Sequence, residues 1–168
     1  MFELLRSSNP GPGPGLGTAL ALPHHAGVLR AGMSERAAQW AVAALADVRE
    51  TWVCGAGWAF SASYEGLELL AYGGTDDADA AHNRAGLDTL VLSRQPGTAH
   101  GPSAVPVALD DVDLFGHPAA DVLGVVGERP YPDVILRTHT PASSCLGEIL
   151  IRQVRQDIPV AEGGVLDT

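Results

Sequence analysis

The chain has 168 residues, of which 46% are hydrophobic and 18% charged, and its formal net charge at pH 7 is −10. This composition excludes intrinsic disorder, and the length is that of one domain able to bury a core without disulfide or metal staples. An acidic chain without a basic stretch repels phosphate, so nucleic-acid binding is disfavoured. The charge would attract a basic protein or a cationic ligand, and keeping the protein in solution is the simpler explanation of it.

The chain begins with a region, residues 1–17, that is predicted to be a flexible tail. Its segment SNPGPGPGLG (8–17) alternates proline and glycine, which prevents a helix or a central strand. No segment approaches the ~20 apolar residues of a membrane span, and the two cysteines are too few for a disulfide framework. A cytoplasmic location is therefore expected. All ten basic residues are arginine, which is typical of a GC-rich bacterial genome such as that of an actinobacterium.

Two strands and a helix are predicted next. LGTALAL (16–22) is a short strand, and GVLRAG (27–32) is a turn or second strand. MSERAAQWAVAALADV (33–48) is a helix that Ser34 can cap. Its apolar residues recur every three or four positions and form one stripe, which includes Trp40.

The segment WAFSASYEGLELLAYGG (58–74) predicts a β-hairpin with Glu65-Gly66 as its turn. Alternation places one set of side chains toward the core: Trp58, Phe60, Ala62, Tyr64, Leu67, Leu69 and Ala71. The other face carries a mixed set that includes Glu68, Leu70 and Tyr72. A short helix over 75–86 and a strand over 87–94 follow.

The second half is predicted to repeat this plan. AVPVAL (104–109) is an edge strand because of Pro106, and VDLFG (112–116) leads into a short helix with Pro118 at its first position. Gly127 is expected as a left-handed cap. Strands at 133–137 and 147–155 and a tail at 159–168 complete the chain.

Gly32 and Gly116 occupy corresponding places, 84 residues apart, which is half the chain length. This spacing predicts two strand–helix–hairpin units, about 18–94 and 104–158, within one domain over 18–158; chance similarity of two helix starts is the alternative. In either case the fold class is α+β, an antiparallel sheet with helices on one face.

The phrase LRAGMSERAA (29–38) resembles the helix-opening signature of the SmpA/OmlA group and of the β-lactamase inhibitor protein. The resemblance covers about 27–74. It implies a scaffold of helix and β-hairpin units, in tandem in the inhibitor, that binds other proteins through the open face of its sheet without catalysis. Residues 1–8 show no lipobox or signal-peptide pattern, and two cysteines cannot form the paired disulfides of the inhibitor, so secretion and an outer-membrane role are not expected.

The leading hypothesis is a non-catalytic bacterial binding module of the immunity-protein or adaptor kind, acting as a monomer or homodimer. It is expected to bind a basic protein, such as a toxin or effector, through acidic and aromatic side chains of the open sheet face. The residues predicted to make this contact are Glu68, Tyr72, Asp76, Asp77, Glu148 and Arg152.

The alternative is a small enzyme or small-molecule-binding protein of actinobacterial secondary metabolism. His139 and Cys145 lie six residues apart and could form a thiolate nucleophile, although a buried structural cysteine explains the same residue. The sequence equally allows a pocket for a small molecule, lined by Trp40, Trp58 and Phe60. No metal-ligand spacing or phosphate loop is present, so neither a metal nor a cofactor is expected.

Overall fold

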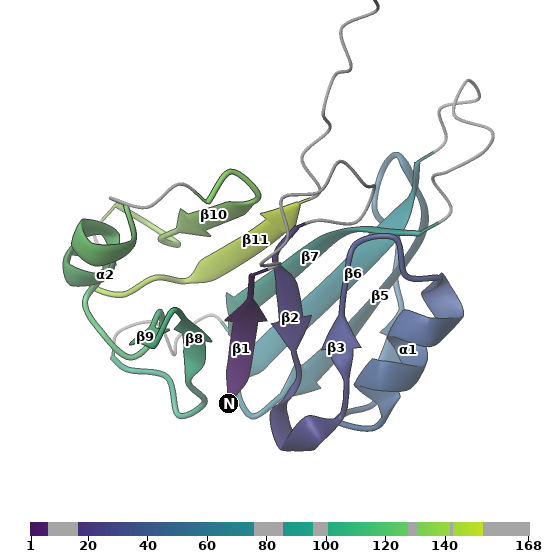
Figure 1. The fold of residues 1–168 in the computed structure, drawn as a ribbon, viewed down its shortest axis with the longest axis horizontal. Coiled ribbons are helices and arrows are strands. Elements are labelled where there is room, and N and C mark those ends of the chain that lie inside the picture. The colour runs from purple at the N-terminus through teal and green to yellow at the C-terminus, as the bar shows by residue number, and fades with distance from the viewer. Residues whose placement is uncertain (7–16, 76–85, 96–100, 128–130, 142, 153–168) are drawn as a thin grey trace, which may run out of the picture.

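The computed structural model describes residues 1–6, 17–75, 86–95, 101–127, 131–141 and 143–152. Within these ranges, two β-sheets enclose the core, and two α-helices lie at opposite ends of the smaller sheet (Figure 1). The helices are α1 (Glu35–Ala43) and α2 (Ala119–Val126), and the 3-10 turn η1 (Pro23–His25) joins two strands of the smaller sheet.

The smaller sheet has five strands in the order β3-β2-β1-β8-β9, with bounds β1 Phe2–Leu5, β2 Ala19–Ala21, β3 Val28–Leu29, β8 Val107–Leu109 and β9 Val112–Asp113. The larger sheet has six strands in the order β10-β11-β7-β6-β5-β4, with bounds β4 Val48–Glu50, β5 Ala56–Tyr64, β6 Leu67–Thr75, β7 Leu87–Arg94, β10 Val134–Arg137 and β11 Glu148–Arg152. All neighbours in the larger sheet are antiparallel, whereas β1 and β8 are parallel. The α+β class with mainly antiparallel pairing is confirmed.

The hairpin predicted from the sequence is β5–β6. Glu65 and Gly66 form its turn and have φ values of 46° and 86°, the left-handed backbone that a two-residue hairpin turn requires. Its register contains the predicted pairs, namely Tyr64–Leu67, Ala62–Leu69 and Phe60–Ala71.

One face of the larger sheet is buried against the smaller sheet and the helices. Phe2 of β1, Phe60 of β5 and Phe115, which follows β9, are each at most 1% exposed and belong to one hydrophobic core. Ala38 and Val42 of α1 enter the same core. The helix begins where Ser34 Oγ accepts a hydrogen bond from the backbone N–H of Ala37 (3.3 Å), so the predicted cap is confirmed.

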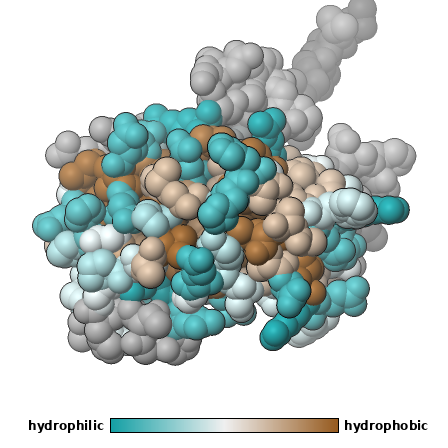
Figure 2. Space-filling view, turned by 90° about the horizontal axis from the view of Figure 1, so that it is seen from below, coloured by the Kyte–Doolittle hydropathy of each residue, from teal (hydrophilic) through white to brown (hydrophobic). Residues whose placement is uncertain are grey.

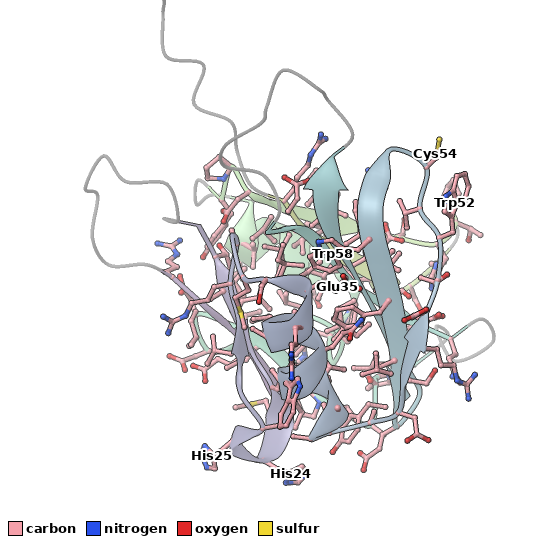
Figure 3. All side chains as sticks on the ribbon, turned by 90° about the vertical axis from the view of Figure 1, so that its right-hand side faces the viewer. His24, His25, Glu35, Trp52, Cys54 and Trp58 are labelled. Atoms are coloured by element: carbon pink, nitrogen blue, oxygen red, sulfur yellow. The ribbon has the colours of Figure 1, made fainter. Side chains whose placement is uncertain are left out.

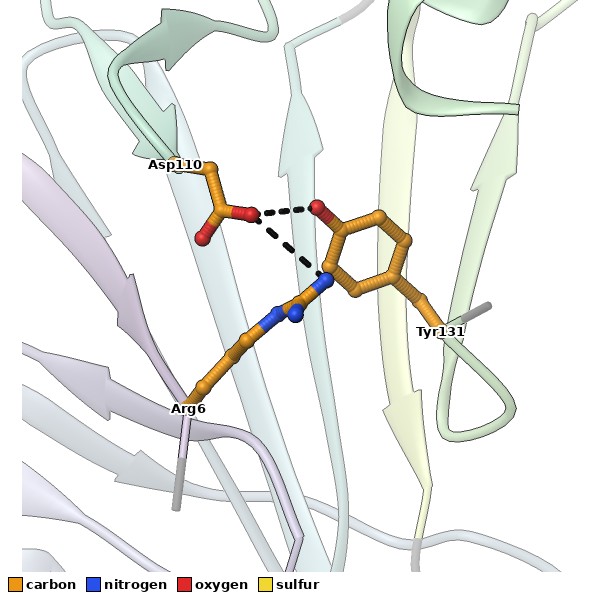
Figure 4. Close-up of polar contacts among 3 residues, drawn as sticks. All are labelled: Arg6, Asp110 and Tyr131. Atoms are coloured by element: carbon orange, nitrogen blue, oxygen red, sulfur yellow. Dashed lines mark hydrogen bonds and ion pairs between the residues drawn. The ribbon is translucent and has the colours of Figure 1, made fainter. Parts of the chain in front are cut away.

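A cluster of three side chains ties the smaller sheet to the segment before β10 (Figure 4). The Arg6 guanidinium lies over the Tyr131 ring, 4.2 Å from its centroid, and one of its nitrogens is 3.5 Å from Asp110 Oδ2. The Tyr131 hydroxyl donates a hydrogen bond to that same oxygen (2.7 Å). Three segments far apart in sequence are thereby joined by one cation–π contact, one ion pair and one hydrogen bond.

The N-terminal tail prediction is wrong at its start, because Phe2–Leu5 form β1 in the middle of the smaller sheet. Alternating burial of these residues, with Phe2 and Leu4 in the core, explains the strand. β1 pairs with both β2 and β8 and so joins them into a second sheet, where one sheet was expected. Residues 7–16, 76–85 and 153–168, which include most of the predicted 75–86 helix and the C-terminal tail, lie outside the described residues.

The helix predicted over 33–48 is shorter than expected. The backbone N–H groups of Leu45 and Ala46 both donate to Val42 O, and Val48 then pairs with Ala62 as the start of β4. Trp40, placed in the apolar stripe, is 71% exposed, because the core meets the helix at Ala38 and Val42 instead.

Two further details differ in the second half. Strand β8 begins at Val107, after Pro106, and lies between β1 and β9, so it is not an edge strand. Gly127 has φ −65° rather than a left-handed value, and its N–H donates to Leu123 O (2.8 Å), which continues the helical pattern. Pro118 is the N-cap residue of α2, one position before the first helical residue.

Candidate protein-binding face

The face of the larger sheet that points away from the core is referred to below as the open face. Alternation along each strand assigns its residues, because successive side chains point to opposite sides. The assigned residues are Arg49 of β4; Ala59, Ser61 and Ser63 of β5; Glu68, Leu70 and Tyr72 of β6; Thr89, Val91 and Ser93 of β7; Glu148, Leu150 and Arg152 of β11; and Ile135 and Arg137 of β10.

Four aliphatic residues form a row across the open face. Leu70 pairs with Val91, Val91 with Leu150, and Leu150 with Ile135, so one side chain comes from each of four neighbouring strands. Ile135 is 41% exposed and the other three are partly exposed. None of the four belongs to the hydrophobic core or to the residues packed against it. We call these four residues the apolar row.

A polar row runs beside the apolar row, one step along the strands. It consists of Ser63, Glu68, Ser93, Glu148 and Arg137, each paired with the next. Glu68 and Glu148 therefore lie on either side of Ser93. Arg137 donates a hydrogen bond to Glu148 Oε1 at 3.3 Å, which forms an ion pair on the surface.

The row on the other side contains Ala59, Tyr72, Thr89 and Arg152, again in register. Tyr72 is partly exposed and Arg152 exposed, whereas Thr89 is buried. The apolar row is thus bordered by carboxylates on one side and by a tyrosine and an arginine on the other.

Four of the six predicted contact residues lie together on this face: Glu68, Tyr72, Glu148 and Arg152. Asp76 and Asp77 lie outside the described residues. The face is less acidic than expected, because its described part also carries Arg49, Arg137 and Arg152.

Sequence reasoning did not select the apolar row or Trp52. The signal for the row lies in VILR (134–137) and EILIR (148–152), where consecutive aliphatic residues occupy both faces of a strand. Trp52 lies in the β4–β5 connection, is 79% exposed, and lies on the side of β5 opposite α1 (Figure 3). An exposed tryptophan on that side adds aromatic surface at the margin of the open face.

The candidate nucleophile pair is not assembled. His139 Nε2 lies 3.1 Å from the backbone oxygen of Arg94, and its ring packs against Gly147. Cys145 is 5% exposed and its sulfur lies 4.0 Å from Ser144 Oγ. Each residue of the pair thus has other neighbours, and burial of Cys145 fits a structural cysteine.

The proposed aromatic pocket is not formed either. Trp58 stacks on Phe60 with ring centroids 6.0 Å apart and planes 9° apart, and Phe60 is fully buried. Trp40 projects into solvent from α1. Trp58 and Phe60 therefore pack together at the edge of the core, and Trp40 does not line a pocket with them.

The end of the molecule that holds η1 presents hydrophilic side chains interspersed with hydrophobic ones (Figure 2). There His24 Nε2 lies 2.9 Å from the Tyr64 hydroxyl. Partial burial, followed by the negative charge of Glu65, raises the pKa of Tyr64 above its usual value of 10.0. A hollow of about 480 Å³ lies beside the β5–β6 turn. Its lining includes Arg49 and Ser63 of the open face, so the hollow adjoins one corner of that face.

Within the described ranges, no group of three or more His, Cys, Asp or Glu side chains is arranged to hold a metal ion. No helix in the described part of the chain is long and apolar enough to cross a bilayer. No protein-family model, curated protein or solved structure matches this chain.

Proposed function

We propose that this protein is a non-catalytic bacterial binding module, of the immunity-protein or adaptor kind, that holds a basic protein on its open face. The observation that carries the proposal is the apolar row. Four aliphatic side chains in register across Leu70, Val91, Leu150 and Ile135 are excluded from the core, with polar side chains on both sides. Apolar surface with a polar rim is the usual composition of a protein-binding patch.

Electrostatics support a basic partner. The net charge of −10 attracts a cationic protein from a distance and raises its association rate in a salt-dependent way. At closer range, Glu68 is exposed and Glu148 already pairs with Arg137. Glu68 is therefore the carboxylate on this face best suited to a partner's arginine or lysine.

The proposal includes a cytoplasmic location. Cys54 is an exposed free thiol and Cys145 a buried one, and the two form no disulfide. An exposed thiol persists in a reducing compartment, whereas it is readily oxidised outside the cell.

The two-unit organisation is also part of the proposal. The N-cap residues of both helices, Ser34 and Pro118, each form an isolated antiparallel bridge, to Gly86 before β7 and to Cys145 before β11. In chain order the two bridges correspond, because each joins the start of a helix to the segment before a later strand of the larger sheet. Superposition of the α1–β7 unit on the α2–β11 unit tests this; a fit no better than that of unrelated α+β fragments would contradict duplication.

The function is tested by capture from bacterial lysate with three baits: the natural chain, Val91→Glu and Leu123→Glu. The control changes another exposed apolar residue, on α2, to the same acid. A basic partner should be held by the natural chain and by Leu123→Glu. Its affinity for Val91→Glu should fall at least about 30-fold, the effect of losing ~2 kcal/mol at an interface centre.

A second measurement separates steering from contact. Glu68→Arg and Glu3→Arg change the net charge equally, but Glu3 lies on β1 in the other sheet. Both variants should slow association with the purified partner at low salt, and only Glu68→Arg should speed dissociation. The open face would be refuted as the binding surface if Val91→Glu and Leu123→Glu bound the partner with equal affinity. Equal dissociation rates for Glu68→Arg and Glu3→Arg would refute it as well.

A further inference from the structure

The shape of the apolar row limits what kind of segment can dock on it. The row runs across the strands rather than along them, because its members are cross-strand partners. Neighbouring strands are about 4.8 Å apart, so the row from Leu70 to Ile135 spans roughly 14 Å. A partner segment must therefore present apolar side chains at intervals near 5 Å along a line perpendicular to the strands.

An α-helix satisfies this spacing. Side chains at positions i, i+3, i+7 and i+10 lie on one face and, at 1.5 Å per residue, recur about every 5 Å over roughly 15 Å. An extended strand presents same-face side chains only about every 6.7 Å, which is too long a repeat for the row. Strand addition is also excluded along the row, because the inner strands β7 and β11 are paired on both sides.

The flanks of the row differ in charge, which gives the docked helix an orientation. Glu68 and Glu148 lie on one side of the row, and Arg152 lies on the other beside Tyr72. Arg137, also on the first side, is engaged with Glu148. A helix with basic side chains on one edge of its apolar stripe complements the Glu68 side.

We infer that the partner contributes an amphipathic α-helix of about three turns, laid across the strands, with its apolar stripe on the apolar row and its basic edge against Glu68. This inference rests on the proposed function, since it takes the open face as the binding surface. It adds the structural class of the docking segment and its direction relative to the strands.

The inference is tested by display selection of random linear peptides of about 16 residues, long enough for three helical turns with flanks, against the full chain. Val91→Glu and Leu123→Glu serve as counter-baits. The expected peptides repeat apolar residues at three- and four-residue spacing and carry Arg or Lys beside that stripe. They become helical by circular dichroism on binding and lose at least about tenfold in affinity toward Val91→Glu, but not toward Leu123→Glu.

The flank assignment is read from the same peptides. Glu68→Arg should weaken them about tenfold, and replacement of their basic edge by glutamine should remove that difference. The helix inference would be overturned if the Val91-dependent peptides carried alternating apolar residues or showed no helical signal when bound. The proposal that the open face is the binding surface would then still stand. A selection that yields no Val91-dependent peptide would overturn the inference and count against the proposed function as well.

Discussion

Leu69 and Leu70 are consecutive residues of β6 that face opposite sides of the larger sheet. Leu69 is 3% exposed within the core, whereas Leu70 is partly exposed in the apolar row. The pair provides a matched comparison, because the residue type, the strand and the backbone environment are the same.

We expect Leu69→Ala to lower the free energy of unfolding by about 2–5 kcal/mol, since it leaves a cavity between the sheets. Leu70→Ala should lower it by no more than about 1 kcal/mol, because solvent already reaches that side chain. Urea denaturation of the two variants measures the difference. Similar losses for both would mean that the open face is covered in solution.

The cluster of Arg6, Asp110 and Tyr131 should stabilise the junction between the smaller sheet and β10. Tyr131→Phe removes the hydrogen bond to Asp110 and keeps the ring under Arg6, so a loss of about 1 kcal/mol is expected. Arg6→Ala removes the cation–π contact and the partly exposed ion pair, worth up to about 1 kcal/mol each. A double-mutant cycle in chemical denaturation measures the coupling; strictly additive losses would contradict a joint cluster.

The cap of α1 offers a further test. Ser34→Ala removes the acceptor for the Ala37 N–H and should cost about 1 kcal/mol of stability, whereas Ser34→Asp should retain most of it. Ser63→Ala, on an exposed strand position, is the control and should change stability by less than about 0.5 kcal/mol. Thermal unfolding of the three variants provides the measurement, and a neutral Ser34→Ala would count against the cap.

Tyr64 should titrate above the usual tyrosine range. Burial and Glu65 raise its pKa in the folded state, so the unfolded chain loses this proton first as pH rises. The contribution of Tyr64 to stability is therefore complete below pH ~10 and is lost above it, as the pH passes through the raised folded-state pKa.

Phenolate absorbance, taken as the difference between the natural chain and Tyr64→Phe, reports this titration. Glu65→Gln should move the midpoint part of the way down, because it removes the second cause and leaves burial. A Tyr64 midpoint at or below the usual value would contradict the environment described for the β5–β6 turn.

The open face could be predicted in part. Period-two alternation in 58–74 together with a Glu-Gly turn fixes the hairpin register, so Glu68, Leu70 and Tyr72 fall on one side whatever surrounds them. Glu148 and Arg152 share a side for the same reason. Their meeting with Glu68 and Tyr72 depends on β11 pairing with β7, a contact between strands about 60 residues apart that local periodicity does not encode.

Local sequence therefore determined the hairpin, the Ser34 cap, the existence of most strands and the net negative charge, because each depends on neighbours within a few residues or on composition. Tertiary structure decided the insertion of Phe2–Leu5 between β2 and β8, the early end of α1 at the start of β4, and the exposure of Trp40. It also assembled the apolar row from four strands. These features depend on long-range strand pairing and on which of two apolar faces the core covers. The local sequence does not decide between the faces, because a strand such as EILIR carries aliphatic residues on both.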